Sequence, residues 1–242
     1  MAKTQKYLTT TGIQPIACRR AALTLTLAVL GLNLLCGMKS SADDLVPLDI
    51  KLPPPAFVGT PKDVKAGSDV EPVSDKPRPP LMVPKGVVNL APSATVTSSD
   101  TNATPAALKK LTDGNKDAMD DNVLLLRKGT QYAQFDLGSP QEIYAIVVWH
   151  AHESPKVYHG VVVRLADDAA FTDNVRTLFN NDVANATGLG AGTNREYFES
   201  YEGKLIDAAG AKARYVRLYS KGSTDSALNE YTEVEIYGRP PK

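Results

Sequence analysis

The sequence predicts an antiparallel β-sandwich in its C-terminal part, preceded by an export signal and a proline-rich linker. Short apolar or alternating runs bounded by turn residues recur between residues 89 and 238, and helical patterns are scarce there. The first 87 residues carry no such strand pattern. We therefore expect a signal peptide over residues 1–42, an extended or disordered linker over residues 43–87 and one sandwich domain over residues 88–239.

The N-terminal segment has the order of a secretory signal. Adjacent arginines precede the uncharged run over residues 21–35, and small residues lead up to Ala42. The run is short for a membrane span, so we expect cleavage after Ala42 and no span in the mature chain. The protein would then be exported, to the periplasm, the cell surface or the medium. Retention as an anchor and lipidation at Cys36 stay open as alternatives, although a bulky Leu35 precedes that cysteine.

The segment over residues 43–87 is typical of a tether. Proline recurs too often there for a helix or a central strand, and the charges alternate in sign. An alternative interpretation concerns residues 47–61, PLDIKLPPPAFVGTP, whose apolar side chains are unusual for a spacer. This stretch could be a docking peptide for another protein of the cell envelope.

The C-terminal part contains several runs of strand length bounded by Gly, Pro, Asn, Asp or Ser. We predict strands over residues 94–97, 131–137, 142–149, 160–166, 214–219 and 232–237. Both alternate sets of side chains in IYAIVVW, residues 143–149, are mostly apolar, which predicts a strand covered on both faces. The one helix predicted spans residues 106–111, with Thr104 as its cap and Pro105 in its first turn.

Composition excludes several classes of function. Basic and acidic residues both number 27, so the formal net charge is zero and the electrostatic drive for binding nucleic acid is missing. Both cysteines, Cys18 and Cys36, lie in the predicted signal, which excludes disulfides, cysteine-ligated zinc and cysteine nucleophiles in the domain. No catalytic triad order, phosphate loop or cofactor fingerprint occurs, so we expect a protein that is not an enzyme. A glycosidase-like pair of carboxylates stays open.

A series of short segments in a fixed order resembles a known family. These segments are NLAPSATVTSS, LTDGNKD, QYAQFDLG, IYAIVVW, ARYVRLYS and EVEIYG. Together they are similar to the discoidin or factor 5/8 type C family of galactose-binding-like jelly rolls, over about residues 89–238. The resemblance implies a jelly-roll sandwich used in carbohydrate binding or adhesion. The sequence departs from the family where DGNKDAMDDN lacks an aromatic residue and where residues 171–206 form a longer, more polar segment.

The segment around Asp113 and Asn115 is a candidate calcium site. A carboxylate and, through the turn that glycine permits, backbone carbonyls would point the same way, as a hard cation requires. The resemblance implies that this turn lies against the last strand and that calcium has a structural role. The implied ligands are the carbonyls of Lys110, Asn115, Ala118 and Thr232 and the carboxylates of Asp113 and Glu233. The alternative is an Asx-type turn without metal.

All three histidines lie between residues 150 and 159, directly after the predicted central strand. A transition-metal site built with Glu153 or His159 is one interpretation. A second is a sugar site with a stacking face and polar partners, formed by Trp149, His150, His152, Glu153 and Lys156. A third keeps Trp149 in the core and leaves the others in water.

The hypothesis that joins these observations is a non-catalytic, exported module that binds a glycan or polysaccharide, or serves in adhesion. The alternative is a structural or assembly subunit of a cell-envelope or extracellular complex, which would bind an envelope protein through the proline-rich tether. Neither hypothesis includes a nucleic-acid partner.

Overall fold

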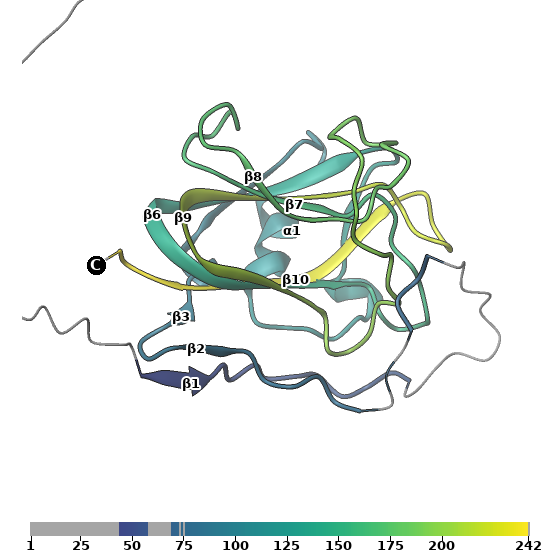
Figure 1. The fold of residues 1–242 in the computed structure, drawn as a ribbon. Coiled ribbons are helices and arrows are strands. Elements are labelled where there is room, and N and C mark those ends of the chain that lie inside the picture. Colours follow the sequence, from purple (N-terminus) through teal and green to yellow (C-terminus); the bar gives the residue numbers. More distant parts are fainter. Residues whose placement is uncertain (1–43, 58–68, 73, 75, 242) are drawn as a thin grey trace, which may run out of the picture. The chain divides into compact units, whose positions relative to one another are not determined.

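The computed structural model describes residues 44–57, 69–72, 74 and 76–241, coloured by sequence in Figure 1. The predicted signal peptide over residues 1–42 lies outside these residues. Within the described part of the chain, no helix has the length and apolar character that crossing a membrane requires.

Strands dominate the described residues. The strands are β1 (Leu45–Pro47), β2 (Met82–Pro84), β3 (Val88–Asn89), β4 (Thr95–Ser98), β5 (Leu124–Leu126), β6 (Gln131–His150), β7 (Val162–Ala166), β8 (Arg176–Asn180), β9 (Lys204–Ser220) and β10 (Asn229–Arg239). The helical elements are α1 (Pro105–Lys109) and the 3-10 turns η1 (Ala91–Ser93), η2 (Lys110–Thr112) and η3 (Asp120–Asn122). The helix begins as predicted, because the Thr104 hydroxyl accepts a hydrogen bond from the Ala107 amide at 3.2 Å.

The two longest strands, β6 and β9, each run through both layers of an antiparallel sandwich (Figure 1). The first half of β6 pairs with β4 and with the end of β9, which continues to β7 and β8. The second half of β6 pairs with β10 and with the start of β9. The register of the β6–β9 pair shifts between Asp136 and Gln141, where the strands bend from one layer to the other. The predicted antiparallel β-sandwich is thereby confirmed.

The main core lies between the two layers, and a second apolar cluster covers the opposite face of β6. Ile146 and Val148 point into the main core with Phe135, Leu218 and Val234. The alternate residues Ala145, Val147 and Trp149 point outward and join Tyr237 in the second cluster. The prediction that residues 143–149 are covered on both faces is confirmed, since all three outward side chains are fully buried.

The cover over this outer face is the segment expected to be a tether. We call residues 44–57 and 76–87 the strap. Leu48, Ile50, Leu81 and Val87 pack against the outer cluster. The two arms pair through β1 and β2, and the Leu48 amide donates to the Leu81 carbonyl at 2.8 Å.

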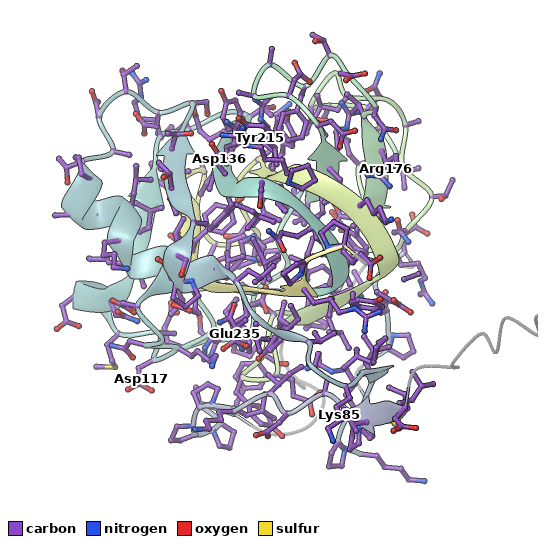
Figure 2. The ribbon with its side chains drawn as sticks, turned by 90° about the vertical axis from the view of Figure 1, so that its left-hand side faces the viewer. Lys85, Asp117, Asp136, Arg176, Tyr215 and Glu235 are labelled. Atoms are coloured by element: carbon purple, nitrogen blue, oxygen red, sulfur yellow. The ribbon has the colours of Figure 1, made fainter. Side chains whose placement is uncertain are left out.

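The expectation of a separate linker over residues 43–87 therefore needs correction for the residues described. The backbone is extended, but apolar side chains between the prolines bury themselves on the sandwich. Within the stretch interpreted as a docking peptide, Leu48 and Ile50 pack on the chain's own sandwich, and residues 58–61 lie outside the described residues. Figure 2 shows Lys85 of the strap and Glu235 of β10 on one side of the sandwich, with Asp136 and Tyr215 on the other.

Candidate functional site

The Asp113 turn follows directly on the short helix and lies against β10. Gly114 has a φ of +86°, and the Asn115 amide donates to Asp113 Oδ1 at 2.9 Å, which makes an Asx turn. The Gly114 amide donates to Glu233 Oε2 at 3.2 Å. The side chain of Asn122 donates to the carbonyls of Asn115 and Asp117 and fixes the far end of the turn.

Glu233 is a buried carboxylate with incomplete hydrogen bonding. It is 1 % exposed, and Oε1 has no hydrogen-bond partner among the described residues. Burial raises the pKa of Glu233 to about 8, with the Asp113 and Glu235 carboxylates adding to the effect and the Gly114 amide opposing it. Thr232 Oγ1, one residue earlier, is likewise buried and unpartnered within the described part.

The residues implied as calcium ligands come from two elements that the fold brings together. Lys110, Asp113, Asn115 and Ala118 belong to the helix end and the turn, and Thr232 and Glu233 belong to β10. An unpaired, buried carboxylate oxygen beside an exposed Asp113 fits an oxygen-binding cation. Ala118 contributes no hydroxyl, and the described residues hold no cluster of three His, Cys, Asp or Glu side chains suited to a metal. Calcium would therefore need backbone carbonyls in addition to the carboxylates of Asp113 and Glu233.

Trp149 corrects the expectation of a stacking face for a sugar. Its ring is fully buried under the strap, and its indole Nε1 donates to the Tyr201 carbonyl at 2.9 Å. Lys116 Nζ lies 5.0 Å from the ring centroid and pairs with Glu235 at 2.8 Å. The alternation of β6 directs the ring to the outer face, where the strap removes it from solvent.

The three histidines have separate partners and form no joint site. His150 Nδ1 donates to Glu199 Oε2 at 2.7 Å in the buried interior, stacked on Tyr158. His152 is 2 % exposed and donates to the Lys116 carbonyl at 2.9 Å. His159 binds Glu196 at 2.7 Å, and that hydrogen bond raises the pKa of His159. The transition-metal interpretation is wrong for this arrangement, and His150 and His152 are interior groups rather than sugar contacts.

Two of the predicted sugar residues, Glu153 and Lys156, do line a cleft. The cleft has a volume of about 320 Å³ and is lined by Val123, Leu125, Ala151, Glu153, Lys156 and Glu230. Lys156 Nζ donates to Glu153 and, at 3.1 Å, to Glu230 Oε2. Burial alone would lower the pKa of Lys156, but these two carboxylates outweigh it and raise the pKa.

The cleft combines charge with an exposed apolar side chain. The Glu153 side chain is 43 % exposed and the Leu125 residue is 56 % exposed. Tyr158 Oη lies 3.0 Å from Glu230 Oε2 and holds that carboxylate in place. Leu125 and Glu230 were not predicted from the sequence as site residues. The run LLL indicates only a buried strand, and Glu230 stands two residues before the run from which the last strand was predicted.

The strand order and pairing define an antiparallel β-sandwich. No protein-family model and no curated protein matches the chain. Among solved structures, the chain is similar to the CBM32 of AlyQ in complex with 4,5-unsaturated mannuronic acid. The identity is 25 % and the TM-score 0.38, over 59 % of this chain and 92 % of that one.

Two further solved structures are similar to the chain. The chitosan-binding module 1 of a chitosanase/glucanase from Paenibacillus sp. IK-5 has 19 % identity and a TM-score of 0.42, over 62 % of this chain and 99 % of that one. A family 89 glycoside hydrolase from Clostridium perfringens has 16 % identity and a TM-score of 0.44, over 63 % of this chain. The match spans only 15 % of the hydrolase chain.

Proposed function

We propose that this protein is a non-catalytic, exported module that binds a carbohydrate in the cleft beside Lys156. The observation that carries the proposal is the composition of the cleft, in which one ammonium and two carboxylates surround an apolar floor. Sugar hydroxyls require such donors and acceptors, and the apolar faces of a pyranose ring require a surface such as Leu125. The export pattern of the first 42 residues supports a polysaccharide outside the cytoplasm as the ligand.

The charges of the cleft are held in place before a ligand arrives. Lys156 is 6 % exposed and fixed between Glu153 and Glu230, so a sugar would meet preorganised groups. Glu153 is the most exposed of these three side chains and is the natural acceptor for ligand hydroxyls. Among the residues that the structure describes, no aromatic side chain lines the cleft, so affinity would come from hydrogen bonds and aliphatic contact.

We expect Glu153→Gln and Leu125→Ala to weaken binding of an oligosaccharide about tenfold each, because a hydrogen bond to a charged group contributes about 1.5 to 3 kcal/mol and a lost apolar contact about as much. The measurement is isothermal titration with oligosaccharides that contain galactose, glucosamine or uronate. The free energy of unfolding of Leu125→Ala should change by no more than about 0.5 kcal/mol, because that side chain is exposed.

The matched control for Leu125 is Val88→Ala on β3, since both residues are 56 % exposed and Val88 lies outside the cleft. This control should bind as the wild type does. If none of the oligosaccharides binds the wild type, the carbohydrate proposal fails and a structural subunit that binds another envelope protein becomes the better hypothesis. If both cleft variants bind normally, the site lies elsewhere.

We further propose that calcium fastens the Asp113 turn to β10, with the Glu233 carboxylate and the Asp113 side chain as its charged ligands. The cation would satisfy Glu233 Oε1, which is buried without a partner in the described part of the chain. Its effect would be structural, since the turn and the strand are 119 residues apart in sequence.

Calcium is expected to raise the melting temperature of the protein, and a chelator is expected to lower it. A ligand that binds only the folded state stabilises it by about 2.7 kcal/mol at a concentration 100 times its dissociation constant. Scanning calorimetry of metal-stripped and calcium-loaded protein measures the shift, and Glu233→Gln should abolish it. Identical transitions with and without calcium would reject the site, as would an equal response to magnesium.

A further inference from the structure

One short segment, residues 198–203, connects the strap to the candidate cleft. It lies outside the named strands, just before β9, and contacts three different parts of the molecule. The three contact partners are the strap, Trp149 near the end of β6 and the loop that carries Lys156.

On the strap side, Arg78 holds this segment by three hydrogen bonds. Its guanidinium donates to the Gly203 carbonyl at 2.7 Å and to the Glu202 carbonyl at 3.0 Å. The Arg78 amide donates to Glu202 Oε1 at 3.1 Å. The Arg78 side chain is half-buried. Lys204, the residue after Gly203, binds the carboxylate of Glu71 through its Nζ at 2.8 Å. Arg78 therefore fastens the second arm of the strap to residues 198–203.

At the end of β6, the same segment is fitted to Trp149. The Tyr201 carbonyl accepts from the indole, and Gly203 lies so close that a Cβ there would be 2.6 Å from Trp149 Cε2. The strap residues Leu48, Ile50 and Leu81 pack against the outer cluster that contains Trp149. Release of the strap would remove both the Arg78 hydrogen bonds and the apolar cover of this fitted contact.

On the cleft side, the segment is bonded to the backbone of Lys156. The Glu199 amide donates to the Lys156 carbonyl at 2.8 Å, and Phe198 forms an antiparallel bridge with Val157. The Glu199 carboxylate also holds His150. The position of the Lys156 backbone, and hence of its ammonium in the cleft, depends on this segment.

We propose that Arg78 is a positioning residue: by latching the strap to residues 198–203, it holds Lys156 in the arrangement in which the cleft binds its ligand. In the structure the strap is docked; loss of the Arg78 contacts would loosen residues 198–203 and with them the Lys156 backbone. The part of this inference that concerns the ligand rests on the proposed function. The mechanical link from Arg78 to the Lys156 backbone does not.

The test is hydrogen exchange of the Glu199 amide in full-length Arg78→Ala, together with the fluorescence of Trp149, the one tryptophan of the chain. We expect the Glu199 amide to exchange about tenfold faster or more, while amides of β7 and β8 keep their protection. Trp149 emission should shift to the red as water reaches the ring. Arg78→Lys keeps the charge but cannot donate to both carbonyls in the same geometry. The Glu199 amide in this variant should therefore exchange at a rate between those of the wild type and Arg78→Ala.

Arg214→Ala is the matched control, because Arg214 makes two hydrogen bonds to Asp136, at 2.7 and 2.8 Å, away from the strap. It should leave the Glu199 amide and Trp149 emission as in the wild type. An unchanged Glu199 exchange rate in Arg78→Ala, or the same acceleration in Arg214→Ala, overturns the proposal. If Arg78→Ala does not fold, Arg78→Lys decides between these outcomes.

The oligosaccharide that binds the wild type serves as the second readout. Its dissociation constant should rise about tenfold in Arg78→Ala and stay unchanged in Arg214→Ala. If no oligosaccharide binds the wild type, the proposed function fails, but the exchange data still decide whether Arg78 positions Lys156. If exchange accelerates while the affinity is unchanged, the link exists but the cleft does not depend on it, and the positioning role is refuted.

Discussion

Replacing Trp149 by alanine is expected to lower the free energy of unfolding by about 3 to 5 kcal/mol, the usual cost of removing a fully buried large aromatic side chain. The ring is 0 % exposed and its indole hydrogen bond to the Tyr201 carbonyl would be lost with it. Urea unfolding at constant m-value measures the change. An exposed stacking residue would cost far less, so a loss below about 1 kcal/mol would contradict the burial of Trp149 and restore it as a sugar contact.

A double-mutant cycle extends this prediction to the strap. Leu81 packs against the outer cluster that contains Trp149, so the losses from Leu81→Ala and Trp149→Ala should not add. Residues in contact show interaction energies of about 0.5 to 3 kcal/mol, whereas distant residues add within about 0.5 kcal/mol. Strict additivity would mean that the strap does not cover Trp149 in solution.

Gly203→Ala is expected to destabilise the protein by about 2 to 5 kcal/mol for two separate reasons. A left-handed backbone, here with φ of +63°, costs an alanine about 1 kcal/mol or more. The new methyl group would also meet Trp149 Cε2 at 2.6 Å, and overpacking of this kind costs about 1 to 3 kcal/mol. Thermal and urea unfolding of the variant measure the sum.

Gly188→Ala separates the two contributions. Gly188 has a similar φ of +76°, but a Cβ there would have no neighbour within 4 Å. It should show the backbone cost alone, so Gly203→Ala should be less stable than Gly188→Ala by the cost of the clash. Equal losses in the two variants would mean that Gly203 does not pack against the indole ring.

The pattern in residues 143–149 shows how much a sequence can predict. Both alternate sets of side chains on this strand are mostly apolar, which predicted that both faces of the strand are buried, and the structure confirms that burial. The same sequence could not identify the outer cover, because prolines on either side of the Leu48–Ile50 stretch and directly before Leu81 obscure any strand or helix period. A tether and a strap differ only in whether such scattered apolar side chains pack against a folded domain.

The candidate sites show the same limit. The turn at Asp113 could be located from its glycine and its two Asx residues, because turn chemistry is local. The cleft could not, since Leu125, Glu153 and Glu230 come from three separate parts of the chain. The burial of Trp149 depended on the strap, which is a tertiary effect. Sequence periodicity predicts which face a side chain points to, but not what lies over that face.

The pairing of β3 with β10 has a consequence for the order in which the chain can fold. Asn89 pairs with Tyr237, and β10 also supplies the neighbour of β5 and of the second half of β6. The first and last strands of the sandwich are thus joined, and the intermediate strands stay open along one edge until the C-terminal strand arrives. Such long-range pairing makes folding slow and dependent on a complete chain. A chain that has not yet acquired β10 would expose the apolar edge of β6, and unpaired strand edges of this kind favour aggregation.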